Sequence, residues 1–140
     1  MTTRSRSDDA GSSVLFGSDR VFRVWRYGSG HSQLLLRAAP DSAHPVRLDL
    51  LFEGVDAMQL VTRYEALELH TLDEEETGRI FELSGVPARW RSDRLVLGLR
   101  SRSGAGYVQC LKVSALLGGT NVLGPDDPSE SVDVVWSLRG

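Results

Sequence analysis

The sequence has a single cysteine and no long apolar run. Cys110 is the only cysteine in 140 residues, which excludes an internal disulfide and any cysteine-rich zinc site. No apolar stretch reaches the roughly 18 residues that a membrane-spanning helix needs. The segment Met1 to Ser13 lacks the apolar centre of a signal peptide. These absences predict a cytoplasmic protein that does not associate with a membrane.

The composition is typical of one folded domain. Hydrophobic residues make up 41% of the chain and charged residues 25%, and this length suits a single hydrophobic core. Residues 1–13 combine serine, arginine and aspartate with almost nothing to bury. We therefore predict a disordered N-terminal arm over residues 1–13 and a single β-rich domain over residues 14–140.

The charge is unevenly spread along the chain. The net charge of −3 argues against a protein that binds nucleic acid through its overall charge. Segment 51–78 nevertheless holds one arginine and eight acidic residues, whereas segment 79–112 holds seven basic and two acidic ones. An acidic stretch is thus followed directly by a basic one.

Alternating apolar and polar residues predict that most of the chain forms strands. In segment 46–52, Leu48 and Leu50 fall on the buried face and Asp49 on the outer face. Most of the connections have the length of hairpin loops, so we predict an all-β domain, an antiparallel β-sandwich or small barrel of about eight strands. The predicted strands are 21–27, 33–37, 46–52, 66–72, 79–83, 94–99, 107–114 and 132–138.

The middle of the chain allows two interpretations. Segment 58–72 has some apolar residues at helical spacing, so a short helix is the alternative there. We favour a strand at 66–72, because its apolar and polar residues alternate. We expect the polar segment 73–78 to connect this strand to a returning strand at 79–83.

No catalytic or metal site is predicted. His31, His44 and His70 are the only histidines, and neither a Gly-x-Ser-x-Gly elbow nor a His-x-His spacing is present. We therefore expect no metal and no cofactor. The alternative is an enzyme in a small barrel that uses His31 or His70 with Tyr27 or Tyr64 as acid and base.

Two further features receive a structural interpretation. Cys110 lies in an apolar strand pattern, which is typical of a buried and inert thiol. Arginines around Trp90 resemble a surface for single-stranded nucleic acid, but one aromatic residue makes a poor stacking platform. Nucleic acid is therefore not the expected partner. The arginines are Arg89, Arg91, Arg94, Arg100 and Arg102.

Two segments carry a resemblance to known proteins. Segments 24–37 (VWRYGSGHSQLLLR) and 47–60 (RLDLLFEGVDAMQL) resemble small uncharacterised β-rich proteins of high-GC Gram-positive bacteria. The Leu-Phe-x-Gly-Val unit is also similar to one in β-rich immunity proteins of bacterial toxin systems. The first likeness implies no activity, and the second implies a bacterial protein that neutralises a partner by binding it.

The function that the sequence favours is a non-catalytic protein-interaction domain. It would dock on a basic protein through an acidic surface around residues 53–76, because clustered carboxylates speed association with cationic partners. The alternative is a small β-barrel that binds a small molecule. A homo-oligomer is compatible with either function. The predicted partner-binding residues are Tyr64, Glu65, Glu68, Asp73, Glu74, Glu75 and Glu76.

Overall fold

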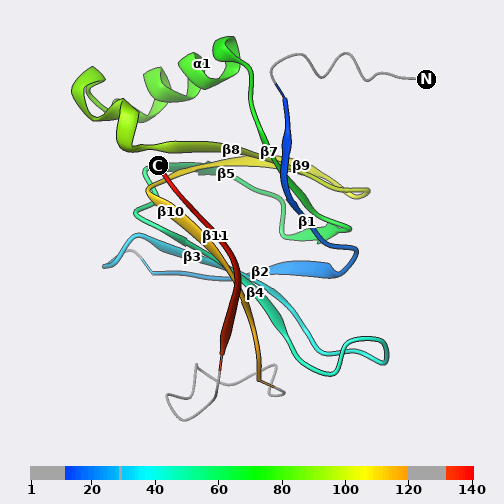
Figure 1. Ribbon diagram of the computed structural model, residues 1–140. Coiled ribbons are helices and arrows are strands. Elements are labelled where there is room, and N and C mark those ends of the chain that lie inside the picture. Colours follow the sequence, from blue (N-terminus) through cyan, green and yellow to red (C-terminus); the bar gives the residue numbers. More distant parts are fainter. Residues whose placement is uncertain (1–11, 29, 120–131) are drawn as a thin grey trace.

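Two antiparallel sheets lie face to face in the computed structural model, which describes residues 12–28, 30–119 and 132–140 (Figure 1). The arrangement confirms the predicted antiparallel β-sandwich. In spatial order, the five-stranded sheet contains β1 (Val14–Gly17), β7 (Glu68–Thr71), β8 (Leu95–Arg100), β9 (Ala105–Cys110) and β5 (Ala57–Gln59). The six-stranded sheet contains β11 (Asp133–Arg139), β10 (Lys112–Leu117), β4 (Leu48–Glu53), β3 (Gln33–Ala38), β2 (Val21–Gly28) and β6 (Arg63–Glu65). The predicted N-terminal arm lies outside the described residues, except for Ser12 and Ser13.

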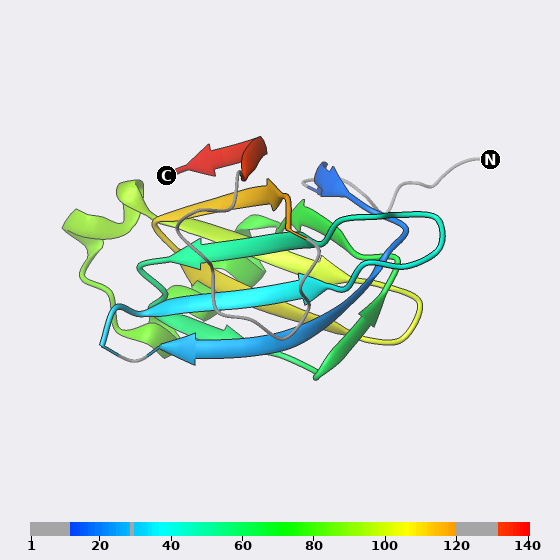
Figure 2. The ribbon, with the colours of Figure 1, turned by 90° about the horizontal axis from the view of Figure 1, so that it is seen from below.

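The hydrophobic core fills the space between the two sheets. As predicted, Leu48 and Leu50 of β4 face this core while Asp49 faces outward. Because side chains alternate along a strand, each strand of the six-stranded sheet presents its other residues on the outer face. Figure 2 looks onto the molecule from the side of this sheet, with β2, β3, β4 and β10 next to one another. The core residues include Phe22, Leu36, Phe52, Leu69, Leu97, Leu99, Val108 and Val113.

One helix replaces the predicted returning strand. The sequence predicts a polar connection and a strand for segment 73–83, but α1 spans Glu74–Ser84. Asp73 is the N-cap and accepts a hydrogen bond from the Glu76 backbone N–H, and Gly85 ends the helix in a left-handed conformation. Ile80 and Phe81 form the buried side of the helix. Figure 1 shows α1 beside the five-stranded sheet, away from the six-stranded one.

The segment between residues 55 and 72 forms strands and no helix. The favoured strand at 66–72 is confirmed as β7, and the helix considered for residues 58–72 is wrong. The short strand β5, which follows β4 along the chain, pairs with β9 in the other sheet. None of the described helices is long and apolar enough to cross a membrane.

The chain changes sheets twice at the same corner. The predicted single strand 107–114 is two strands, β9 and β10, which belong to different sheets and meet at Leu111. The chain also passes from β4 to β5 at Gly54, which has a φ of 67°. A Cβ on Gly54 would lie 2.6 Å from Leu111 Cδ1, and the Leu111 N–H donates to the Glu53 carbonyl over 2.9 Å. The two crossings therefore pack against each other.

Candidate functional site: an arginine row on the outer face

Three arginines stand side by side on the outer face of the six-stranded sheet. Arg23 of β2 lies directly opposite Arg63 of β6 on one side and Arg37 of β3 on the other. Residues that are directly opposite in antiparallel strands point to the same face. Like charges in such positions destabilise a sheet, and negative charge nearby relieves the repulsion within this arginine row (Arg63, Arg23 and Arg37).

The two outer members of the arginine row have carboxylate partners. Asp49 follows Arg37 in the same register, and the pair is bidentate: Nε to Oδ1 at 2.9 Å and Nη2 to Oδ2 at 3.0 Å. Arg63 forms an ion pair with Glu65. Within the described part of the chain, no carboxylate pairs with the central Arg23, whose side chain is exposed. Arg23 is thus the member of the arginine row whose charge faces solvent without a carboxylate partner among the described residues.

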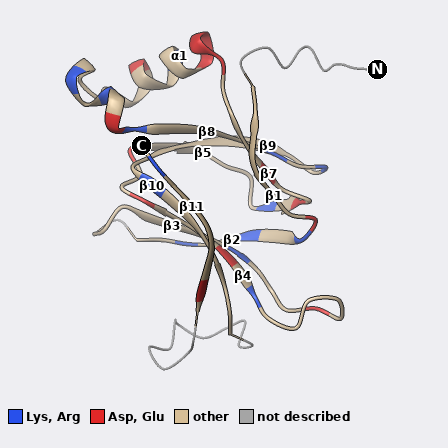
Figure 3. Ribbon diagram, viewed as in Figure 1, with Lys and Arg blue, Asp and Glu red and all other residues tan. Residues whose placement is uncertain are grey.

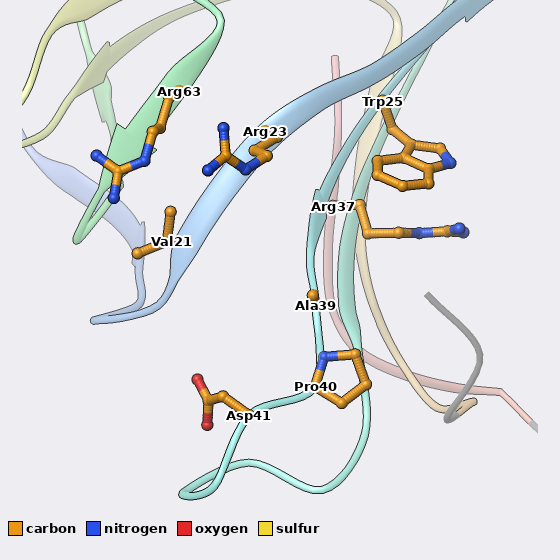
Figure 4. Close-up of a pocket in the computed structure, with 8 residues that line it drawn as sticks. All are labelled: Val21, Arg23, Trp25, Arg37, Ala39, Pro40, Asp41 and Arg63. Atoms are coloured by element: carbon orange, nitrogen blue, oxygen red, sulfur yellow. The ribbon is translucent and has the colours of Figure 1, made fainter. Parts of the chain in front are cut away.

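The arginine row lines a hollow of about 440 Å³ (Figure 4). This volume is within the range of small-molecule sites in proteins. In Figure 4, Arg63, Arg23 and Val21 lie on one side, Trp25 lies over Arg37, and Asp41 lies at the end away from Trp25. Apolar and cationic groups are therefore mixed in this hollow. The lining residues are Val21, Arg23, Trp25, Arg37, Ala39, Pro40, Asp41 and Arg63.

Arg37 is fixed in place from two sides. Its guanidinium carbon lies 5.2 Å from the centre of the Trp25 ring, a cation–π geometry. Its bidentate partner Asp49 also accepts from Arg47 Nε over 3.3 Å. All three charged groups are buried although they lie toward the outer face, with Arg37 only 3% exposed. The wall of the hollow that Arg37 and Trp25 form is thus rigid.

The loop that follows β3 forms the other wall, and Arg20 fixes it. Arg20 Nη2 donates to the carbonyls of Ala38, Ala39 and Val46 at 3.3, 2.9 and 2.8 Å. Burial lowers the pKa of Arg20, an effect that the nearby charge of Asp41 partly offsets. Three hydrogen bonds to backbone carbonyls hold both ends of the loop, since Ala38 and Val46 flank it.

Asp41 places one carboxylate in this otherwise cationic hollow. Its Oδ1 accepts from the backbone N–H of Ala43 at 2.9 Å, from that of His44 at 2.8 Å, and contacts His44 Nδ1 at 2.9 Å. The hydrogen bond to His44 is the largest of the effects that lower the pKa of Asp41. Asp41 is therefore ionised at neutral pH and held in a turn that its own side chain stabilises.

The predicted acidic surface is spread over three elements. Figure 3 shows the acidic residues on both sheets and at the start of α1. Glu65 pairs with Arg63, Glu68 pairs with Arg100 at 2.8 Å, and Asp73 caps α1. Glu74, Glu75 and Glu76 occupy the first turn of α1, where the helix dipole favours negative charge. Each of these acidic residues thus has an ion-pair partner or a favourable position within the fold.

Tyr64, one of the predicted partner-binding residues, does not lie on the surface. Its side chain is 0% exposed and belongs to the core. Its hydroxyl accepts a hydrogen bond from the Val61 N–H at 3.1 Å, and burial raises its pKa. A partner would have to open the edge of the sandwich to reach it.

The structure does not gather the histidines and tyrosines of the alternative enzyme hypothesis. Tyr27 and His31 lie exposed near the β2–β3 turn, whereas His70 lies on β7 of the other sheet. His70 Nδ1 is 2.9 Å from the Thr71 carbonyl. In the described ranges no hydrogen bond joins a histidine to a tyrosine, and no cluster of His, Cys, Asp or Glu could hold a metal.

Three of the five arginines around Trp90 make side-chain contacts with other segments of the fold. Arg91 stacks on Phe81, Arg94 pairs with Asp56 at 2.6 Å, and Arg100 pairs with Glu68. These contacts reduce the charge available to a nucleic acid. Cys110 is buried in the core, and burial raises its pKa to about 12, so the thiol stays protonated, as expected of an inert cysteine.

Sequence reasoning missed the residues that the hollow brings together. Arg37 and Arg63 lie in separate strand segments, and Asp41 lies in a loop. The signal was present as an outward arginine in each of three neighbouring strands. Their alignment depends on the register, which includes a bulge between Val24 and Arg26.

Comparisons with known proteins found no matching family model, no matching curated protein and no matching solved structure. The two likenesses noted for segments 24–37 and 47–60 therefore stay predictions.

Proposed function

We propose that this chain is a non-catalytic binding domain that holds an anionic group, a carboxylate or phosphate, over the arginine row. The observation that carries the proposal is the central position of Arg23, between two other arginines and without a carboxylate partner in the described residues. A bound anion would supply the missing counter-charge. The proposal keeps the predicted class of function, a binding domain. It differs in the charge of the binding surface, which is positive here, whereas the sequence predicted an acidic one.

The chemistry of arginine supports binding over proton transfer. A guanidinium is always protonated and presents its N–H donors in a planar fork that fits carboxylate and phosphate oxygens. Such charge-assisted hydrogen bonds are about twice as strong as neutral ones. Because Arg37 is already fixed by Asp49 and Trp25, little conformational entropy is lost when a ligand binds beside it.

The test uses a variant of the central arginine and a matched control. Arg23→Gln removes the unpaired charge, and Arg89→Gln makes the same charge change in the 3₁₀ helix Ala88–Asp93, near the five-stranded sheet. Each protein is titrated by calorimetry with inorganic phosphate, adipate, aminohexanoate and an oligoglutamate peptide. The small molecules and the peptide distinguish a free ligand from an acidic segment of a protein.

We expect at least one of these probes to bind the native chain. Its affinity should fall tenfold or more in Arg23→Gln, since a charge-assisted hydrogen bond contributes about 1.5–3 kcal/mol, and should stay unchanged in Arg89→Gln. The proposal fails if none of the probes binds up to about 10 mM, the weak end of specific affinity. It also fails if binding survives in Arg23→Gln.

A further inference from the structure

The hollow contains one carboxylate, that of Asp41, as well as the arginine row, and only one of the two carboxylate oxygens makes hydrogen bonds. The three hydrogen bonds of Asp41 all go to Oδ1. Among the described residues, no hydrogen bond or ion pair reaches Oδ2, and none joins Asp41 to Arg23 or Arg63. One oxygen of Asp41 is therefore available to a cation in the hollow.

The position of Asp41 is set before any ligand arrives. The backbone N–H groups of Ala43 and His44 hold its side chain, and Arg20 holds the loop through three carbonyls. Figure 4 places Asp41 at one end of the hollow, the Trp25–Arg37 pair away from it, and Arg23 on the side of Val21 and Arg63. The hollow thus has a negative end and a positive remainder.

Apolar groups lie between these charges. Val21, Ala39 and Pro40 line the hollow on the side of Asp41. A short hydrocarbon chain fits such a surface, because removing CH₂ groups from water is favourable.

We propose that the hollow takes a zwitterionic small molecule, with its anionic group over Arg23 and its ammonium group at Asp41. An apolar spacer between the two groups lies against Val21 and Pro40. This inference rests on the proposed function, since it assigns the anionic end of the ligand to the arginine row. The ω-amino acid is then preferred over a dicarboxylate of the same length, because a second negative group at that end would meet the carboxylate of Asp41.

The experiment compares ligands that differ only in one terminal group. ω-Amino acids of increasing chain length are titrated beside the alkanoate, the alkylamine and the dicarboxylate of each length. The same titrations are run with Asp41→Asn and with Asp73→Asn. Asparagine keeps the side-chain oxygen that accepts the turn hydrogen bonds, so Asp41→Asn removes charge with little change of shape.

Asp73→Asn is the matched control. Asp73 also accepts a hydrogen bond from the backbone three residues later, with Oδ1 at 2.8 Å from the Glu76 nitrogen, but it caps α1 on the other side of the molecule. Thermal unfolding of both variants reports any loss of stability separately from binding.

We expect one ω-amino acid to bind at least threefold more tightly than its alkanoate and its dicarboxylate, a ratio typical of an exposed ion pair. Asp41→Asn should abolish this preference and Asp73→Asn should retain it. If the dicarboxylate binds as tightly as the ω-amino acid and depends on Arg23, the zwitterion inference is overturned while the proposed function stands. If no ligand binds in an Arg23-dependent manner, the zwitterion inference and the proposed function are both overturned.

Discussion

Gly54 illustrates how one residue position controls the crossing between the sheets. It combines a left-handed φ of 67° with the close approach of Leu111. Gly85 at the end of α1 has a similar φ of 74°, but an added Cβ there would meet nothing within 4 Å. A side chain at either position would strain the backbone, but only one at Gly54 would also clash. Comparing the two positions therefore distinguishes the cost of backbone strain from the cost of a steric clash.

We predict that Gly54→Ala destabilises the protein more than Gly85→Ala. The left-handed conformation costs an L-residue about 1–2 kcal/mol at either position. At Gly54 the displaced Leu111 adds overpacking of about 1–3 kcal/mol. Urea unfolding of both variants measures the two losses, and equal losses would show that Leu111 moves aside freely.

At the scale of one element, α1 shows a signal that the sequence contained. Asp73 followed by Glu76 has the spacing of an N-terminal capping box, and Gly85 has the position of a C-terminal cap. The helix was still missed, because it buries only Ile80 and Phe81 and its apolar stripe is short. For an element this weakly amphipathic, the caps are better predictors than the periodicity.

We predict that Asp73→Ala lowers the free energy of unfolding by about 1 kcal/mol, the usual contribution of an N-cap. The variant loses the acceptor for the Glu76 N–H, which lies 2.8 Å away. Asp73→Asn keeps an acceptor and should lose less than half as much. Circular dichroism during thermal unfolding provides the measurement. Equal destabilisation by alanine and asparagine would mean that the charge of Asp73 matters more than its hydrogen bond.

At the scale of the whole molecule, alternation predicted the strands but not their assignment to sheets. The strands β2, β3, β8 and β11 correspond closely to predicted segments. The change of sheet at Leu111 leaves the alternation nearly undisturbed, so 107–114 resembled one strand. The arginine row depends in turn on pairing between β6, β2 and β3, which involves residues about 14 to 40 positions apart. The alternation of apolar and polar residues within one segment does not specify which strands pair or in which register.

The paired crossings also predict how the molecule unfolds. The segments β4–β5 and β9–β10 each link the two sheets, and they pack against each other at Gly54 and Leu111. The sheets share one core, so neither can open without exposing the apolar face of the other. We therefore expect a single two-state transition.

Tryptophans on the two sides of the sandwich make this prediction measurable. Trp90 lies in the 3₁₀ helix near the five-stranded sheet, whereas Trp25 and Trp136 lie on the six-stranded sheet. Trp90→Phe leaves fluorescence from the six-stranded sheet alone, and Trp25→Phe with Trp136→Phe leaves fluorescence from Trp90 alone. Within each variant, the urea midpoint from fluorescence should equal that from circular dichroism. A Trp90 transition that precedes the loss of circular dichroism would show that α1 and the five-stranded sheet unfold as a separate unit, and the two crossings would then not couple the sheets.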